Sequence, residues 1–552
     1  MINKNLVFLL PILFLLLNQV HVNAVTHNYA PRNIDVERSP KNILVGSYVG
    51  GRSHIKPMLD VTTILAERGH NVILLTFGKF EPSSEYPGLK QITLGPSVST
   101  VKENKRLKVN SDVDFRTMAE FMKLSINTYN ETYEKYKNVV KEYNIDLFFC
   151  DILTNEVCID AAHNLKKPVV GFTSFLQLVD QKSYKSDPFF GCSISLENES
   201  FFERFRCNLI QPLQNAYALW APNRQLNDLR NKMNIKMVSG ILPKLSLALV
   251  DNFFGFELPQ SLTPNVQEIG PVLSDEYPPL TPEISNFINL HKRVLYVAFG
   301  GRFFTTTENN NKILQSLVEV INKKLVDGVI WALSETSKDD FYPTLNLTDG
   351  TQLQTLPVLN NKHPHIHITK FAPQFAVLNH TNTKLFFSHG GTGSVHESLY
   401  AGVPMLVLPL GGDQRGNAQR LATAGVALSL NKYSLDVNDI VNKIDSLLKD
   451  EHVKKNSERM KFLARINSKR KYRAADLVEY ILYSNSLLDK YVGDEFLKEW
   501  ISIESRMGFI KANDLDIYGA LIGVILVLIG GITIKLTSNR SSSSFKIKSK
   551  KA

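Results

Sequence analysis

The chain alternates between short apolar runs and longer stretches with helical spacing. The apolar runs are four to seven residues long, end in glycine or polar residues, and recur in two sets. Buried runs separated by helical stretches are typical of parallel sheets in α/β domains. The first set comprises Asn42–Ser47, Asn71–Phe77, Ile145–Cys150, Pro168–Thr173 and Leu245–Val250, and the second comprises Arg293–Phe299, Val329–Leu333, Ile366–Thr369, Lys384–Ser388 and Met405–Leu408.

A proline-rich segment, Gly270–Pro279, interrupts this alternation and predicts a boundary between two domains. We expect an N-terminal domain over residues 25–275 and a C-terminal domain over residues 283–510. The last part of the second domain, from Ser457 to Arg506, is mainly helical in spacing.

The two ends of the chain are apolar in different ways. Lys4, the run Leu6–Leu17 and a small-residue site ending at Ala24 predict a secretory signal peptide over residues 1–24, with an N-terminal anchor as the alternative. Ile517–Ile534 is 18 residues without a charge, long enough at about 1.5 Å per residue to cross a bilayer, and predicts a transmembrane helix over residues 517–536. Because the tail 537–552 is basic, the positive-inside rule places it in the cytosol and the two domains in the lumen, as a single-pass type I protein.

The tail also accounts for much of the basic charge, a formal net +10. No clustered basic face remains in the body, so a nucleic-acid partner is not expected.

The ending Lys548–Ala552 fits a K-x-K-x-x pattern that resembles endoplasmic-reticulum retrieval signals; a generic basic tail is the alternative. The four sequons in the two domains (Asn130, Asn198, Asn346 and Asn379) agree with a lumenal glycoprotein. Of the four cysteines, Cys192 and Cys207 are the pair we would join, with free thiols equally compatible.

The segment from Phe371 to Gln414 carries most of the chemistry. Its strand, Lys384–Ser388, runs into the glycine-rich turn His389–Ser394, and a helix-like stretch follows. Such a turn directs backbone N–H groups and a helix N-terminus at an anion, and Ser394 is the expected N-cap. A second strand brings Asp413 and Gln414 to the same edge, because ligands of open α/β sheets bind at the carboxyl ends of strands.

The order and spacing of these elements resemble the donor-binding signature of the UDP-glycosyltransferase family. The matching elements are Phe371-Ala372-Pro373-Gln374, His389-Gly390-Gly391-x-x-Ser394, Glu397, Gly402-Val403-Pro404 and Asp413-Gln414. The resemblance implies the GT-B fold: two doubly wound, Rossmann-like α/β domains facing each other across a cleft, here followed by the C-terminal transmembrane helix.

The resemblance also implies a role for each matching residue. Phe371 would stack on uracil in a uridine site that includes Gln374. His389 and Ser394, with the amides of Gly391 and Gly393, would contact the diphosphate. Glu397 would accept hydrogen bonds from the ribose, and Asp413 and Gln414 would hold the transferred sugar. Plant members usually have Trp in place of Phe371 and Asn in place of Gly393, so only the backbone of Gly393 can serve here.

A base for the acceptor proton is expected at His54, in a loop after the first strand that resembles the family's catalytic-histidine loop. Asp151, at the end of another strand, would orient the imidazole. Asp160 is the fallback, and a helix N-cap is the alternative role for Asp151. The resulting mechanism is a single displacement with inversion at the sugar C1.

No cofactor or metal is expected beyond a UDP-sugar as co-substrate. Two D-x-D matches, Asp112–Asp114 and Asp514–Asp516, are interpreted as solvated carboxylates. The expected partners are a UDP-sugar, a lipophilic hydroxyl acceptor and a membrane. Gly519-x-x-x-Gly523 would permit a homo-oligomer.

Two other functions compete with this one. A dinucleotide oxidoreductase is disfavoured because no G-x-G-x-x-G loop with a distal acidic residue is present. The other is a non-catalytic lumenal UDP-sugar-binding protein.

The segment Pro188–Trp220 is rich in Phe. We expect it to line the acceptor pocket or to lie on the membrane surface, with ordinary core helices as the alternative.

Overall fold

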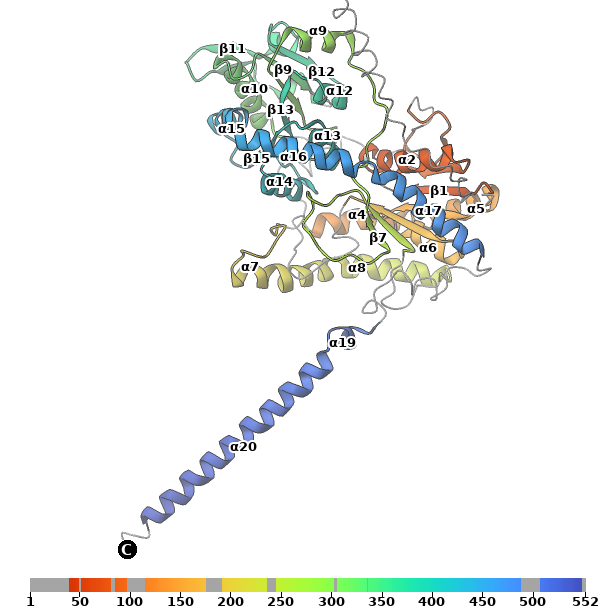
Figure 1. Cartoon of the computed structure of the whole chain (residues 1–552), viewed down its shortest axis with the longest axis vertical. Coiled ribbons are helices and arrows are strands. Elements are labelled where there is room, and N and C mark those ends of the chain that lie inside the picture. The colour runs from red at the N-terminus through yellow and green to blue at the C-terminus, as the bar shows by residue number, and fades with distance from the viewer. Residues whose placement is uncertain are drawn as a thin grey trace, which may run out of the picture. The chain divides into compact units, whose positions relative to one another are not determined.

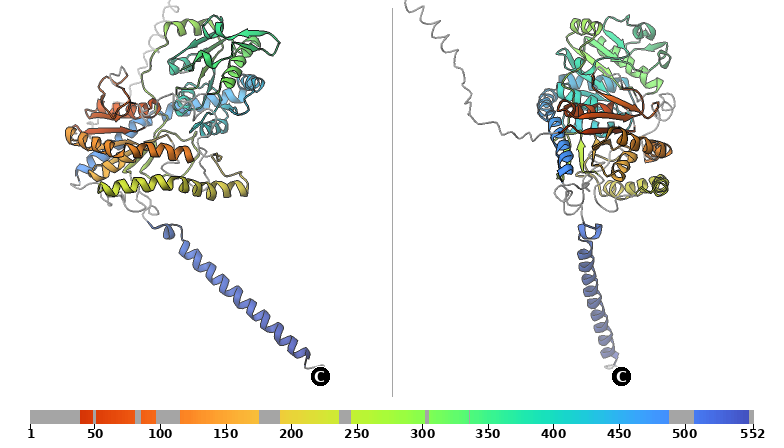
Figure 2. Two further views of the ribbon diagram at one scale, coloured as in Figure 1. Left: turned by 180° about the vertical axis from the view of Figure 1, so that it is seen from behind. Right: turned by 90° about the vertical axis from the view of Figure 1, so that its right-hand side faces the viewer.

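A computed structural model describes residues 39–48, 51–80, 85–96, 115–174, 191–235, 245–301, 305–334, 336–487 and 507–548. The expected signal peptide and the D-x-D match at Asp112–Asp114 lie outside these residues. Figures 1 and 2 show two sheets with helices packed around each of them, as expected for two Rossmann-like domains.

The first sheet has seven parallel strands in the order β3-β2-β1-β4-β5-β6-β7. The order reverses between β1 and β4, which are neighbours in the sheet although distant in sequence. The strands are β1 (Asn42–Ser47), β2 (Asn71–Thr76), β3 (Lys90–Thr93), β4 (Leu147–Asp151), β5 (Val169–Thr173), β6 (Leu247–Val250) and β7 (Val266–Glu268). The helices are α2 (Arg52–Glu67), α4 (Phe115–Asn127), α5 (Tyr129–Tyr143), α6 (Glu156–Asn164), α7 (Phe201–Phe205), the π-helical turn η3 (Arg206–Ile210) and α8 (Gln211–Lys232).

The second sheet has six parallel strands in the order β12-β9-β8-β13-β14-β15, and its order reverses between β8 and β13. The strands are β8 (Val294–Ala298), β9 (Gly328–Ala332), β12 (Ile366–Thr369), β13 (Thr383–Ser388), β14 (Met405–Val407) and β15 (Ala427–Ser429), with a separate hairpin of β10 (Thr344–Asn346) and β11 (Gln352–Gln354). The helices are α9 (Pro282–Leu290), α10 (Thr307–Asn322), η4 (Lys338–Asp340), α11 (Thr355–Leu359), α12 (Gln374–Leu378), α13 (Thr392–Ala401), α14 (Gln414–Thr423), α15 (Val437–Lys449) and α16 (Glu451–Asn467).

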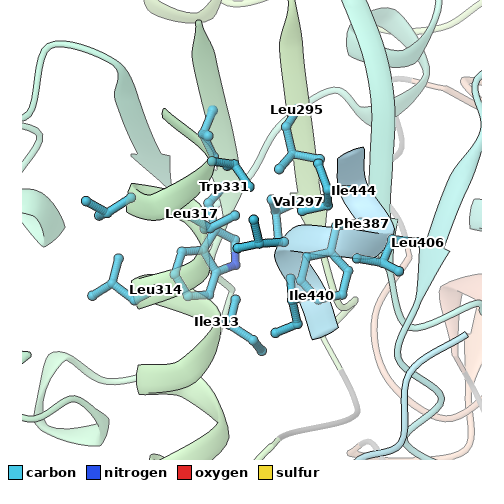
Figure 3. Packing of buried hydrophobic residues seen from close by; sticks show 14 of the residues in the cluster. Leu295, Val297, Ile313, Leu314, Leu317, Trp331, Phe387, Leu406, Ile440 and Ile444 are labelled. Atoms are coloured by element: carbon cyan, nitrogen blue, oxygen red, sulfur yellow. The ribbon is translucent and has the colours of Figure 1, made fainter. Parts of the chain in front are cut away.

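One face of this second sheet is closed by α10 and α15. Figure 3 shows Leu295, Val297 and Phe387 of the strands against side chains of these two helices. Trp331 lies in the same cluster and is 1% exposed. The rigid core fixes the carboxyl ends of β8 and β13, where the glycine-rich turn begins.

Helix α17 (Arg470–Leu487) packs on the first sheet although it follows the second one in sequence. Ala474, Val478 and Ile481 are fully buried in the same cluster as Ile43 and Leu59. At its edge, Glu479 accepts from Arg68 Nη1 at 2.6 Å and lies 3.1 Å from Nε2 of His70. The chain therefore passes between the two domains twice: once after β7 into the second domain, and again through α17, which returns to the first.

Two helices follow, the short α19 (Phe509–Ala512) and the 34-residue α20 (Leu515–Lys548). Within α20, Leu515–Leu536 is long and apolar enough to cross a membrane, and its most apolar stretch is not buried against the rest of the protein.

Two disulfides are present, Cys192–Cys207 and Cys150–Cys158. The first is the pair suggested by the sequence, and the second was not foreseen. The interpretation of Pro188–Trp220 as ordinary core helices is wrong for the part that the structure describes, because Phe202 and Tyr217 are 79% and 85% exposed.

Candidate active site

His54 and Asp151 meet where the order of the first sheet reverses. β1 leads into α2 through Gly51, and Asp151 is the last residue of the neighbouring strand β4. His54 was expected in a loop; it lies in the first turn of α2, which begins at Arg52. Its Nδ1 is 3.3 Å from Oδ2 of Asp151. This leaves Nε2 as the ring nitrogen that points away from the carboxylate.

The Asp151 carboxylate is held in place by two further hydrogen bonds. Ser47 Oγ donates to Oδ2 at 3.0 Å, and the Leu153 amide donates to Oδ1 at 3.1 Å. Asp151 is 1% exposed, whereas the His54 side chain keeps a quarter of its surface accessible. The alternative of a helix N-cap does not hold, because α6 begins at Glu156 with Asn155 at its N-cap.

The fallback residue Asp160 has a structural role instead. It receives two hydrogen bonds from Arg230, at 2.7 and 3.1 Å, and one from Tyr129 at 2.6 Å. All of these groups are buried within the first domain. Asp160 therefore joins α6 to α5 and α8 and does not orient His54.

The glycine-rich turn places His389 where the second sheet reverses its strand order. Its imidazole is packed between Gly300 and Gly391: a Cβ atom at Gly391 would lie 2.7 Å from Nε2, and one at Gly300 would lie 3.1 Å from it. Burial lowers the pKa of His389 to about 4, partly opposed by a backbone hydrogen bond with Ala298. His389 is therefore neutral at physiological pH, and it can offer a hydrogen bond but no positive charge.

The helix after the turn begins one turn earlier than expected. Gly391 is the N-cap of α13, so Ser394 occupies the third helical position and is not the N-cap. The amides of Gly393 and Ser394 belong to the first helical turn, whose N–H groups have no acceptor within the helix. They are available to an anion together with the helix dipole.

Gln374, Ser394 and Glu397 form one hydrogen-bonded group. Gln374 Nε2 donates to Ser394 Oγ at 3.1 Å and to Glu397 Oε2 at 2.6 Å. Tyr296 hydroxyl is 3.5 Å from Gln374 Oε1, and burial together with the charge of Glu397 raises the pKa of Tyr296. Phe371, three residues earlier, is 70% exposed and can stack on a planar ligand.

Asp413 and Gln414 lie at the start of α14. Asp413 Oδ2 accepts from the Thr392 hydroxyl at 2.7 Å, the Thr392 amide at 3.2 Å and Asn417 Nδ2 at 2.9 Å. Desolvation raises the pKa of Asp413, and hydrogen bonds from Thr392 and the charge of His54 oppose the shift. His54 of the first domain is therefore near enough to Asp413 of the second for a charge on its ring to influence this carboxyl group.

Gln414 is fully buried, and its Oε1 accepts from the amides of Leu410 and Gly411 at 2.7 and 2.9 Å. Its Nε2 makes no hydrogen bond within the described part of the chain. A buried donor without a partner is costly, so this amide is a ready donor to a bound hydroxyl.

Three neighbours were not anticipated from the sequence: Ser47, Thr392 and Asn417. Thr392 stands inside the glycine-rich turn, where a hydroxyl could have been noticed. The contacts of Ser47 and Asn417 depend on strand pairing and helix position, for which the sequence contains no local signal.

The two reversed sheets, with the candidate site residues at their switch points, define the GT-B fold class. Solved structures share this fold: the calicheamicin glycosyltransferase CalG4 matches with a TM-score of 0.55 and 18% identity, over 81% of this chain and 99% of that one. A Phytolacca americana UGT2 complex with UDP-2fluoro-glucose and pterostilbene matches with a TM-score of 0.55 and 18% identity, over 81% and 100%.

Sequence comparison gives the family. Residues 44–484 match the family described as "UDP-glucoronosyl and UDP-glucosyl transferase". A UDP-glycosyltransferase of Talaromyces amestolkiae is 30% identical over 90% of this chain and 98% of its own length. Human UDP-glucuronosyltransferase 1A3 is 25% identical over 60% and 56%. The chain belongs to this family and is a UDP-glycosyltransferase.

Proposed function

We propose that this protein transfers a hexose or hexuronate from a UDP-sugar to a hydroxyl of a lipophilic small molecule, with inversion at C1. The observation that carries the mechanism is the His54–Asp151 pair, with Nδ1 3.3 Å from the carboxylate and the imidazole still accessible. An oriented imidazole with one free nitrogen is the arrangement a general base requires.

The reaction then proceeds in one displacement. His54 Nε2 takes the proton of the acceptor hydroxyl, the acceptor oxygen bonds to the sugar C1, and the bond from C1 to the β-phosphate oxygen breaks, releasing UDP. Asp151 stabilises the resulting imidazolium. The amides of Gly393 and Ser394 and the α13 dipole stabilise the negative charge that develops on UDP.

The same proposal assigns the donor roles that the family resemblance implies. Phe371 stacks on uracil, and Gln374 lies in the uridine site beside Glu397, whose carboxylate suits the ribose diol. His389 donates to the diphosphate as a neutral imidazole, and Ser394 offers its hydroxyl. Asp413 accepts from sugar hydroxyls and Gln414 Nε2 donates to one.

A lipophilic acceptor is favoured by related structures, which hold 3,4-dichloroaniline in a Polygonum tinctorium enzyme and pterostilbene in the Phytolacca americana enzyme. We place the protein in the endoplasmic-reticulum membrane with α20 as its single span. We also propose that no metal takes part, so that activity persists in EDTA without added Mn²⁺.

The test is UDP release by the detergent-solubilised protein with UDP-glucose, UDP-glucuronate and UDP-galactose, each with mixed phenol, sterol and terpenoid acceptors. His54→Ala should lower turnover by about 10²–10⁴-fold, the usual contribution of a general base. His452→Ala, which changes an exposed histidine on α16, serves as the matched control and should leave the rate unchanged.

Three results would count against the proposal. Full activity in His54→Ala would exclude this mechanism. Retention of the anomeric configuration, read by NMR of the product, would exclude a single displacement. UDP binding without release from any donor would instead favour the alternative, a non-catalytic lumenal UDP-sugar-binding protein.

A further inference from the structure

The loop that follows β6, Asp251–Leu258, starts in the first sheet but is built into the core of the second domain. Phe253 is fully buried and Phe256 is 6% exposed, and both belong to the hydrophobic cluster that contains Val395 and Leu421. Their rings stack at 5.5 Å. We call this segment the β6 loop.

The β6 loop makes a buried ion pair with α14. Glu257 Oε2 is 3.0 Å from Nη2 of Arg420, and their side chains are 1% and 6% exposed. Asn252 Nδ2 donates to the same carboxylate oxygen at 2.8 Å, and the Leu258 amide donates to Oε1 at 2.9 Å. Arg420 lies on the helix that begins with Gln414, so this contact bears on the sugar end of the donor site.

A second contact reaches α13. Asp251 Oδ1 is 3.4 Å from Nδ1 of His396, and both side chains are almost fully buried. The same Oδ1 accepts from the Val272 amide at 2.8 Å, in the connection to the second domain. His396 immediately precedes Glu397, and neither of its ring nitrogens makes a hydrogen bond within the described residues.

The two contacts hold the two helices that supply opposite ends of the donor site. α13 supplies Ser394 and Glu397, which would meet the diphosphate and ribose, while α14 supplies Gln414, which would meet the sugar. Glu257–Arg420 is a buried ion pair, and removing one partner of such a pair leaves the other charge uncompensated, so the helix carrying Arg420 must move towards water or towards another partner. Asp251–His396 is a buried packing contact between a carboxyl group and a neutral imidazole, so its loss should have the smaller effect. A small displacement of a binding group has a large effect on affinity.

We propose that Glu257 and Asp251 of the β6 loop are positioning residues for the donor: through Arg420 and His396 they hold α14 and α13 at the spacing that one UDP-sugar spans. The inference rests on the proposed function, since it takes the donor site to lie between these helices. The first domain thereby contributes to donor binding without touching the donor.

The experiment measures UDP binding by isothermal titration calorimetry and thermal unfolding for the full-length protein. Glu257→Gln should weaken UDP binding about tenfold or more, and Asp251→Asn should weaken it in the same direction. Asp160→Asn is the matched control. It breaks a buried carboxylate–arginine pair of 2.7 Å within the first domain, so it should lower the unfolding temperature without changing UDP affinity.

Asn252→Ala provides a second variant should Glu257→Gln fail to fold, because it keeps the Glu257 charge and removes the 2.8 Å bond that orients this carboxylate, together with the 2.9 Å bond from the Phe253 amide to Asn252 Oδ1. A smaller loss of UDP affinity is expected there. If the β6-loop variants unfold earlier but bind UDP within twofold of the unmodified protein, as Asp160→Asn should, the loop is merely structural and the inference is overturned. Absence of UDP binding by the unmodified protein would instead overturn the proposed function.

Discussion

At the scale of single residues, Asp151 is the group whose surroundings are most completely determined. It holds His54 Nδ1 while accepting from Ser47 and Leu153. Asp151→Asn preserves the size of the side chain but offers His54 an amide, which favours the wrong tautomer. By analogy with triads, turnover should fall by about 10³–10⁴-fold. UDP affinity should be nearly unchanged, because the partners of Asp151 are His54, Ser47 and Leu153, whereas the proposed donor residues lie in or just before α12, α13 and α14.

Ser47→Ala is the control for that substitution. It removes one hydrogen bond to the same carboxylate, worth about 1 kcal/mol in a typical case, and should reduce turnover by less than about tenfold. Steady-state kinetics with a saturating donor measures both variants. Equal rates for Asp151→Asn and Ser47→Ala would show that Asp151 does not set the tautomer.

The residues of the candidate site could be predicted as far as they end strands or match a motif. His54 and Asp151 come after apolar runs, and such ends meet wherever a parallel sheet reverses its order. Thr392 and Asn417 could not be predicted in their present role, because their contacts with Asp413 depend on how α13 and α14 pack.

At the scale of elements, the turn between β13 and α13 can be tested with two neighbouring glycines. A Cβ at Gly391 would lie 2.7 Å from His389, whereas nothing lies within 4 Å of one at Gly393. Gly391→Ala must therefore displace the buried imidazole, at a cost of about 1–3 kcal/mol in unfolding free energy. Gly393→Ala should be nearly neutral in unfolding free energy, within about 0.5 kcal/mol.

Chemical denaturation and UDP titration of the two glycine variants separate folding from binding. Gly391→Ala should lose both stability and UDP affinity. A Gly393→Ala protein that is stable but binds UDP poorly would place the donor against that backbone position. Unchanged stability in Gly391→Ala would contradict the packing around His389.

The elements that could be predicted are the central strands, since buried strands are nearly continuous apolar runs. Three of the four edge strands of the two main sheets, β3, β7 and β15, were not predicted, whereas the fourth, β12, was. β3, for example, reads Lys-Gln-Ile-Thr and has no buried residue. Because β3 is exposed, it lacks the apolar run that marks a buried strand. Only its pairing with β2 defines it as a strand.

At the scale of the whole molecule, three buried groups shape the response to acid. Burial lowers the pKa of His389 to about 4 and of His396 to about 3, from 6.5, so the native state binds fewer protons there than the unfolded chain below pH 6.5. Burial raises the pKa of Asp251 from 3.8 to about 7, which has the opposite sign. Between pH 4 and 6.5 the native state thus holds about one proton fewer on these three groups, and its stability falls on acidification.

His389→Asn removes one of the two histidines and should abolish that net dependence. The slope of unfolding free energy against pH should become flatter by about 1.4 kcal/mol per pH unit relative to the unmodified protein. Urea titrations at pH 7, 6 and 5 measure the difference. Parallel slopes for the two proteins would mean that His389 titrates normally in the native state.

The membrane proposal can be tested by removing residues 507–552. The most apolar stretch of α20 is not buried against the rest of the protein, so its loss breaks no core contact. The full-length protein should remain in the membrane pellet after a carbonate wash. The truncated protein should be soluble without detergent and should bind UDP within about twofold of the full-length value.

A longer deletion, of residues 468–552, is the control. It should destabilise the protein, because it also deletes α17, whose Ala474 and Val478 are fully buried in the core of the first sheet. If the protein lacking only 507–552 still pellets with membranes, its membrane attachment must come from another surface, and the exposed aromatic face around Phe202 and Tyr217 would be the first one to mutate.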